Sequence, residues 1–183
     1  MRSSVKTALI LLPVLLAATA AAGTTFVRVR ADLAQQRAAI NTEWTEVDEA
    51  LQERAELVEN LVNAGQKLAP IGSDVMTQVT EARKAVTGGP GPDDKIQAHL
   101  RLSNALAKVL LEAENHPNLR NDDAFLRLQE EIRNSDDRIA EARLRYNDSL
   151  EHYNARIQSF PQNLVARISG FRRNDAYFPT EHF

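Results

Sequence analysis

The sequence predicts an all-α protein: an elongated antiparallel helical bundle with two long helices and a shorter helical hairpin, preceded by an N-terminal transmembrane helix. Three observations support this fold class. Apolar residues recur every three to four positions over most of the 183-residue chain, which is the period of a helix that buries one face. No window has the strict alternation typical of a strand. An uncharged segment near the N-terminus is long enough to cross a bilayer.

The N-terminal segment is predicted to enter a membrane. Residues 1–6 form a short basic tail with Arg2 and Lys6, and residues 7–27 carry no charge. At about 1.5 Å per residue this segment spans roughly the core of a bilayer. We expect a transmembrane anchor, because the apolar run leads directly into a helical pattern. A removable signal peptide is the alternative, since residues 18–20 resemble a cleavage site. Basic residues flank both ends, which leaves the orientation open.

Residues 26–69 are predicted as one long helix that ends at Pro70 and Gly72. Arg54 and Gly65 occupy two positions of its core-facing stripe where an apolar side chain is expected. The other positions of the stripe follow a three-four spacing: Ile40, Trp44, Val47, Leu51, Val58, Leu61 and Leu68.

Three further helices are predicted. The first begins at an Ser73 N-cap and ends at about residue 87, before the Gly- and Pro-rich run 88–92. The second begins near Asp93, whose carboxylate suits the positive end of the helix dipole, and is closed by Pro117. The last runs from an Asn121 cap to about residue 160. Its stripe comprises Phe125, Leu128, Ile132, Ile139, Ala142, Tyr146, Leu150, Tyr153, Ile157 and Phe160.

The helix lengths restrict the packing. The first and last helices are far longer than the second, so a bundle of four equal rods is excluded. We expect residues 28–168 to form the bundle domain, followed by an aromatic and basic tail over residues 169–183. Two interpretations of the tail stay open: it lies at the lipid headgroups, or its aromatic residues cap the end of the bundle. The residues concerned are Arg167, Phe171, Arg172, Arg173, Tyr177, Phe178 and Phe183.

Several ordered motifs resemble one family. Residues 51–62 read LQERAELVENLV, and residues 138–166 read RIAEARLRYNDSLEHYNARIQSFPQNLVA, with Tyr-Asn repeated after seven residues. Over about residues 40 to 178 the chain resembles the LemA family. It departs from the family pattern at Glu59, where proline is usual, and at His116, where an aromatic residue is usual. The resemblance implies a membrane-anchored, mostly α-helical bacterial protein with no established biochemical activity, and it supplies no catalytic residues.

Composition and motifs give no support to several function classes. The chain has no cysteine and a net charge of −3, so neither thiol chemistry nor a strongly basic nucleic-acid surface is expected. Phosphate-binding glycine motifs are absent from the sequence. Glu112 and His116 are four residues apart on a predicted helix, but the other ligands of a carboxylate-bridged metal site are missing. We therefore predict no cofactor, no metal site and no enzymatic activity, and we place His99, His152 and His182 on the solvated surface.

Six polar residues form the candidate site: Arg54, Asn60, Tyr146, Asn147, Tyr153 and Asn154. A buried arginine needs a partner, so we expect Arg54 to meet a carboxylate or carbonyl of a neighbouring helix. The Tyr-Asn pairs are expected to hydrogen-bond across the bundle and to fix helix register, as polar core residues do in coiled coils. The alternative is that part of this set lines a groove that receives a partner segment.

These observations predict a single-pass protein of the bacterial cell membrane that acts as a scaffold or protein-interaction module. The side of the membrane that holds the bundle is left open. The expected partners are the lipid bilayer, through the N-terminal helix, unidentified envelope proteins and a second copy of the chain, with no nucleic acid. The alternative function is a metal-dependent accessory protein or enzyme whose site forms from residues distant in sequence.

Overall fold

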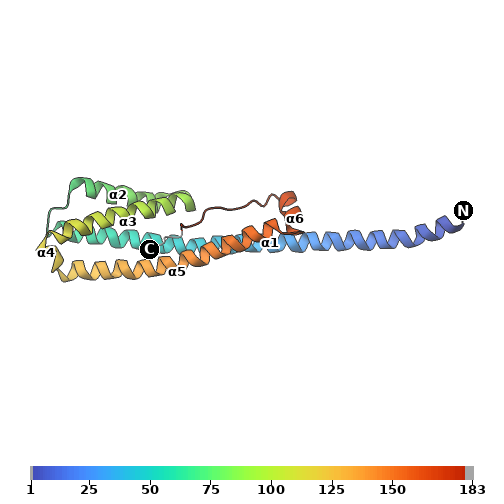
Figure 1. Ribbon diagram of the computed structural model, residues 1–183, viewed down its shortest axis with the longest axis horizontal. Coiled ribbons are helices and arrows are strands. Elements are labelled where there is room, and N and C mark those ends of the chain that lie inside the picture. Colours follow the sequence, from blue (N-terminus) through green and yellow to red (C-terminus); the bar gives the residue numbers. More distant parts are fainter. Residues whose placement is uncertain (1, 180–183) are drawn as a thin grey trace. The chain divides into compact units, whose positions relative to one another are not determined.

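The computed structural model describes residues 2–179, with side chains from residue 13 onward, and every regular element in this range is a helix (Figure 1). The all-α prediction is therefore confirmed. In chain order the helices are α1 (Arg2–Gln66), α2 (Ser73–Gly88), α3 (Pro92–Glu114), α4 (Pro117–Arg120), α5 (Asp123–Gln158) and α6 (Gln162–Ser169).

The first helix is continuous from the apolar N-terminal segment into the amphipathic part of the chain. In the described part of this helix, from Pro13 onward, an 18-residue window is apolar enough to cross a membrane by length and composition, and none of that window is buried by the protein. Pro13 lies inside the helix. Proline is tolerated in membrane helices, because neighbouring groups and small backbone adjustments satisfy the carbonyl that it leaves free.

The chain divides into two compact units. Unit 1 comprises residues 1–39 and 150–174, and unit 2 comprises residues 40–149 and 175–183. Both α1 and α5 therefore contribute one end to each unit.

Unit 2 contains the helical hairpin of α2 and α3 together with parts of α1 and α5 (Figure 1). The predicted stripe of α1 is buried at Ile40, Val47, Leu51, Val58 and Leu61. Leu68 lies beyond the end of the helix and is 38% exposed, so it does not belong to the buried stripe. A glycine occupies position 65 because a Cβ there would lie 3.0 Å from the Ile71 side chain and 3.4 Å from the Phe125 ring.

Ion pairs in unit 2 establish that α1 and α5 are antiparallel. Arg145 pairs with Glu46 at 2.6 Å, and Arg138, one heptad earlier on α5, pairs with Glu53, one heptad later on α1, at 2.7 Å. Arg145 also binds Glu141, four residues earlier on α5, at 2.7 Å. The Arg145 pKa is raised chiefly by its hydrogen bond to Glu46.

Two predicted helix caps are wrong. The N-cap of α2 is Gly72, and Ser73 is the first helical residue. Gly72 donates its backbone N–H to the Glu112 carboxylate at 2.9 Å, so a side chain of α3 fixes the start of α2. The cap of α5 is Asp122 in place of Asn121, because the Asp122 carboxylate accepts the Phe125 N–H at 2.8 Å.

Unit 1 contains α6, which the sequence analysis did not predict. Leu33 of α1, Tyr153 and Ile157 of α5, and Val165 and Ala166 of α6 are buried in this unit. The α6 helix ends at Gly170, whose φ of 76° lies in the left-handed region that glycine adopts without strain. The Phe171 N–H then donates to the Ala166 carbonyl at 2.9 Å, which closes the turn.

Candidate functional site

An aromatic cluster occupies the part of unit 2 around the first Tyr-Asn pair. Trp44 of α1 lies 5.3 Å from the Tyr146 ring of α5, between ring centroids, and Tyr146 lies 6.4 Å from Phe178. His99 of α3 meets Phe178 edge-on at 6.5 Å. Phe178 is 4% exposed. The cluster therefore joins three helices and the C-terminal segment.

Asn147 holds the backbone of Phe178 at this cluster. Its amide nitrogen donates to the Phe178 carbonyl at 3.1 Å, and its amide oxygen accepts the Phe178 N–H at 3.0 Å. An asparagine side chain offers one donor and one acceptor in the same arrangement as a peptide group, so it can satisfy both backbone groups of one residue. Two partly buried polar groups of the C-terminal segment are thereby satisfied.

The second Tyr-Asn pair makes equivalent contacts in unit 1. Asn154 donates to the Asn174 carbonyl at 2.6 Å and accepts the Asn174 N–H at 3.0 Å. The Tyr153 hydroxyl donates to the Arg172 carbonyl at 2.9 Å. Burial raises the Tyr153 pKa, because it disfavours the phenolate. Both asparagine amides thus bind the backbone of the C-terminal segment, where a neighbouring helix had been expected.

The Tyr146 hydroxyl differs from that of Tyr153. It is buried and has no hydrogen-bond partner among residues 2–179. Burial, followed by the charges of Asp93 and Tyr177, raises the pKa of Tyr146 to about 12. The expectation that this hydroxyl bonds across the bundle is therefore wrong for the described residues.

Because only the Tyr153 hydroxyl has a hydrogen-bond partner among the described residues, removing the hydroxyl should change stability differently at positions 146 and 153. We expect Tyr146→Phe to leave the free energy of unfolding unchanged or to raise it slightly, because an unpartnered hydroxyl leaves the interior. We expect Tyr153→Phe to lower it by about 1 kcal/mol, because the Arg172 carbonyl loses its donor. Urea denaturation of both variants in detergent, followed by the fluorescence of Trp44, the only tryptophan, measures the two values. A larger loss for Tyr146→Phe would contradict this account.

Arg54 is the charged residue at the core position of α1. Its Nε lies 2.5 Å from an Asp136 oxygen on α5, and its side chain is 5% exposed, against 50% for Asp136. The Nη1 atom is buried and has no partner among the described residues. The carboxylate expected on a neighbouring helix is thus present, and it reaches only part of the guanidinium group.

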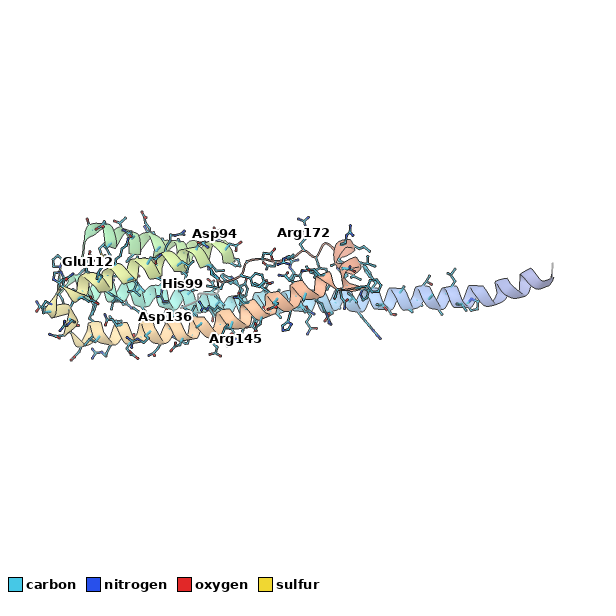
Figure 2. All side chains as sticks on the ribbon, viewed as in Figure 1. Asp94, His99, Glu112, Asp136, Arg145 and Arg172 are labelled. Atoms are coloured by element: carbon cyan, nitrogen blue, oxygen red, sulfur yellow. The ribbon has the colours of Figure 1, made fainter. Side chains whose placement is uncertain are left out.

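Arg54 lines a groove of about 370 Å³ between α3 and α5. His99, Ser103 and Arg143 also line this groove, with Asp136 and Asp137. Figure 2 labels His99 on α3 and Asp136 on α5. Burial, and then the charges of Arg54 and Arg143, lower the pKa of His99 to about 4. The Ser103 hydroxyl donates to the His99 backbone carbonyl at 3.1 Å. The groove therefore provides a neutral, weakly basic imidazole beside a hydroxyl that is committed to the backbone.

We expect Asp136→Asn to lower the free energy of unfolding by about 1 to 2 kcal/mol, because it leaves a buried guanidinium without a counter-charge. The half-exposed position of Asp136 keeps this loss below that of a fully buried pair. Glu53→Gln is the matched control, since Glu53 and Arg138 pair at 2.7 Å with both side chains about half exposed. Its effect should not exceed about 0.5 kcal/mol. Equal losses in the two variants would show that the ion pair of Arg54 contributes no more to stability than an exposed ion pair.

The remaining predicted residues lie away from this cluster. Asn60 is exposed on α1 and does not belong to the polar interior. Glu112 binds the Gly72 backbone, and no group of three or more His, Cys, Asp or Glu suited to a metal ion occurs within the described part of the chain.

The sequence analysis missed two members of the polar interior. His99 was placed on the solvated surface and is instead partly buried, with its ring against Phe178. Lys95 of α3 is 9% exposed and its ammonium group pairs with Asp48 of α1. The apolar residues around Lys95 could have indicated its burial. A lysine at a core-facing position of a helix requires a carboxylate nearby.

A sequence model of the LemA family matches residues 43–182, which include the aromatic cluster, Arg54 and both Tyr-Asn pairs. The chain belongs to the LemA family. The resemblance inferred from the motifs is therefore confirmed.

Individual relatives of this LemA-family chain are magnetosome proteins. It is 30% identical over 114 residues to magnetosome protein MamQ of Magnetospirillum gryphiswaldense, which is 61% of this chain and 42% of that protein. It is 33% identical over 75 residues to magnetosome proteins MamQ 1 and MamQ 2 of Paramagnetospirillum magneticum, which is 41% of this chain and 27% of each relative. The matched region thus spans less than half the length of these relatives, and their names state no reaction.

Proposed function

We propose that this LemA-family chain is a non-enzymatic scaffold of the bacterial cell membrane, anchored by a single pass of α1. Its helical unit 2 would recruit envelope proteins or a second copy of the chain to the membrane surface. Tethering confines unit 2 to a thin layer, which raises the effective concentration of weakly binding partners.

The continuity of α1 is the observation that carries this proposal. One helix holds both the apolar N-terminal segment and the core-facing residues of unit 2. In the apolar part, Val14, Leu15, Leu16 and Val27 are 60 to 72% exposed. A contiguous exposed apolar surface of this length is unfavourable in water and is stable in a bilayer.

The surface of unit 2 supports the recruitment of partners. Unit 2 holds thirteen Lys and Arg against twenty-three Asp and Glu, a net charge of −10. Its most exposed leucines are Leu111 (63%), Leu126 (44%) and Leu144 (59%). A groove of about 450 Å³ lies between α3 and α5, where Leu106, Leu110 and Phe125 line it together with charged residues of both signs. Such a surface favours a basic segment with apolar side chains.

Site-specific crosslinking in intact cells tests the proposal. The natural chain has no cysteine, so a single cysteine at position 111, 126 or 144 can carry a benzophenone crosslinker at one defined place. We expect at least one position to give a reproducible adduct with another envelope protein or with a second copy. A cysteine at position 55, where the native alanine is 0% exposed, gives the background. Monomer alone from all three exposed positions would overturn the proposal.

A further inference from the structure

The α6 helix has apolar residues on two sides. Val165 and Ala166 face the interior of unit 1. Leu164 and Ile168 are 50% and 75% exposed, four residues apart and therefore on one face of the helix, with Arg167 between them. Phe160, just before α6, is 79% exposed. Three large apolar side chains within nine residues thus face outward, together with an exposed arginine.

Unit 1 is basic, whereas unit 2 is acidic. It holds nine Lys and Arg against two Asp and Glu, a net charge of +7. Without Arg2 and Lys6, which precede the apolar segment, seven against two give +5. Arg28, Arg30 and Arg37 of α1 and Arg172 after α6 are all exposed. Basic and apolar side chains together are the combination that binds an anionic bilayer surface.

The contacts within unit 1 place the end of α5 beside the part of α1 that directly follows the apolar segment. The Tyr153 pKa is influenced by the charge of Arg37, and Arg156 pairs with Asp32 at 3.2 Å. Residues later in α5 thus contact residues earlier in α1. Phe160 and α6 follow Arg156 in this direction (Figure 1).

The packed part of unit 1 begins about one headgroup-layer thickness beyond the uncharged segment. Leu33 is 0% exposed and Val27, the last residue of the uncharged segment, is 66% exposed. Six residues separate them, which is about 9 Å along a helix axis. The headgroup region on each side of the hydrocarbon core is on the order of 5 to 8 Å thick. A helix beside this part of α1 therefore lies at the depth where amphipathic helices bind.

We propose that α6 is an interfacial helix that inserts Leu164 and Ile168, with Phe160, into the surface of an anionic bilayer, while Arg167 and Arg172 bind lipid phosphates. This inference rests on the membrane anchor of the proposed function and adds a second lipid contact, more than 120 residues later in the sequence. The contact gives unit 1 a second attachment to the bilayer, in addition to the apolar part of α1.

Nitroxide labels on the full chain in vesicles test the insertion. Because the chain has no cysteine, single cysteines can be introduced at positions 164 and 168, with position 27 as the anchor control and position 144 as an equally apolar, exposed control in unit 2. In vesicles of phosphatidylcholine and phosphatidylglycerol, we expect labels at 164 and 168 to collide at least twofold more with oxygen, relative to a water-soluble nickel reagent, than the label at 144 does. Their depth should be shallower than that at 27.

The outcomes separate the two proposals. Lipid exposure at position 27 with aqueous values at 164 and 168 would overturn the interfacial helix and leave the anchor intact. An aqueous value at 27 would overturn the anchor, and the interfacial helix would fall with it. Immobile labels at 164 and 168 without lipid exposure would indicate a protein contact at α6 and would contradict the proposal.

Charge reversal tests the phosphate contacts separately. With the label at position 168, Arg167→Glu together with Arg172→Glu should lower the ratio of oxygen to nickel collisions at least twofold in anionic vesicles. Vesicles of pure phosphatidylcholine should give a lower ratio with the native arginines as well. Arg133→Glu in unit 2, where the arginine side chain is 76% exposed, is the matched control and should leave the ratio unchanged. Equal ratios for all variants would exclude electrostatic binding.

Discussion

Replacing Phe178 by alanine is expected to lower the free energy of unfolding by about 3 kcal/mol, the largest effect of any substitution in the C-terminal segment. Phe178 is 4% exposed and packs against the rings of Trp44, Tyr146 and His99. Truncation of a buried phenylalanine removes its transfer free energy and leaves a cavity. The variant should also shift Trp44 emission in the folded state, because Trp44 loses a ring 6.4 Å away.

Leu144→Ala is the control for this substitution. Leu144 belongs to the same unit and is 59% exposed, so its truncation should change the free energy of unfolding by no more than about 0.5 kcal/mol. Denaturant titrations of both variants in one detergent, followed by Trp44 fluorescence, give the comparison. A loss below 1 kcal/mol for Phe178→Ala would show that the C-terminal segment contributes little to the folded state, and Asn147 would then have no anchoring role.

The helices follow from local sequence patterns. The three-four stripe of α1 and the Gly- and Pro-rich run before α3 are properties of neighbouring residues, and the structure has helices at these places. The missed helices are short: α4 has four residues and α6 has eight. Neither is long enough for a hydrophobic period to stand out. Proline at position 161 also interrupts the helical pattern after α5, so the sequence did not indicate a further helix.

The contacts of the candidate site depend on residues far apart in the chain. The Tyr-Asn repeat could be recognised, but an asparagine amide binds any backbone residue equally well. Its partners, Phe178 and Asn174, are fixed by where the C-terminal segment lies. The burial of His99 has the same origin, since Phe178 is 79 residues away. A local pattern on α3 contains no information about that contact.

His99 makes the stability of the protein depend on pH. Its pKa is lowered to about 4 in the folded state, by burial first and then by Arg54 and Arg143, against 6.5 in the unfolded chain. Between these values the unfolded chain binds a proton that the folded protein does not bind. The contribution of His99 to the free energy of unfolding is therefore complete above about pH 6.5, falls as the pH decreases toward 4, and levels off below pH 4.

Between pH 7.5 and pH 5.0 we expect this histidine to remove about 2 kcal/mol of stability, which corresponds to about 4 to 8 °C in Tm for a chain of this size. His99→Gln should remove most of that difference, because glutamine does not titrate, whatever it does to the Tm at pH 7.5. His152→Gln is the matched control, since His152 is exposed, and it should keep the native pH dependence. Thermal melts of the three proteins at both pH values decide the question. If His99→Gln keeps the full decrease in Tm, the acid sensitivity arises from other groups, and the imidazole is not held neutral by its contact with Phe178 and the two arginines.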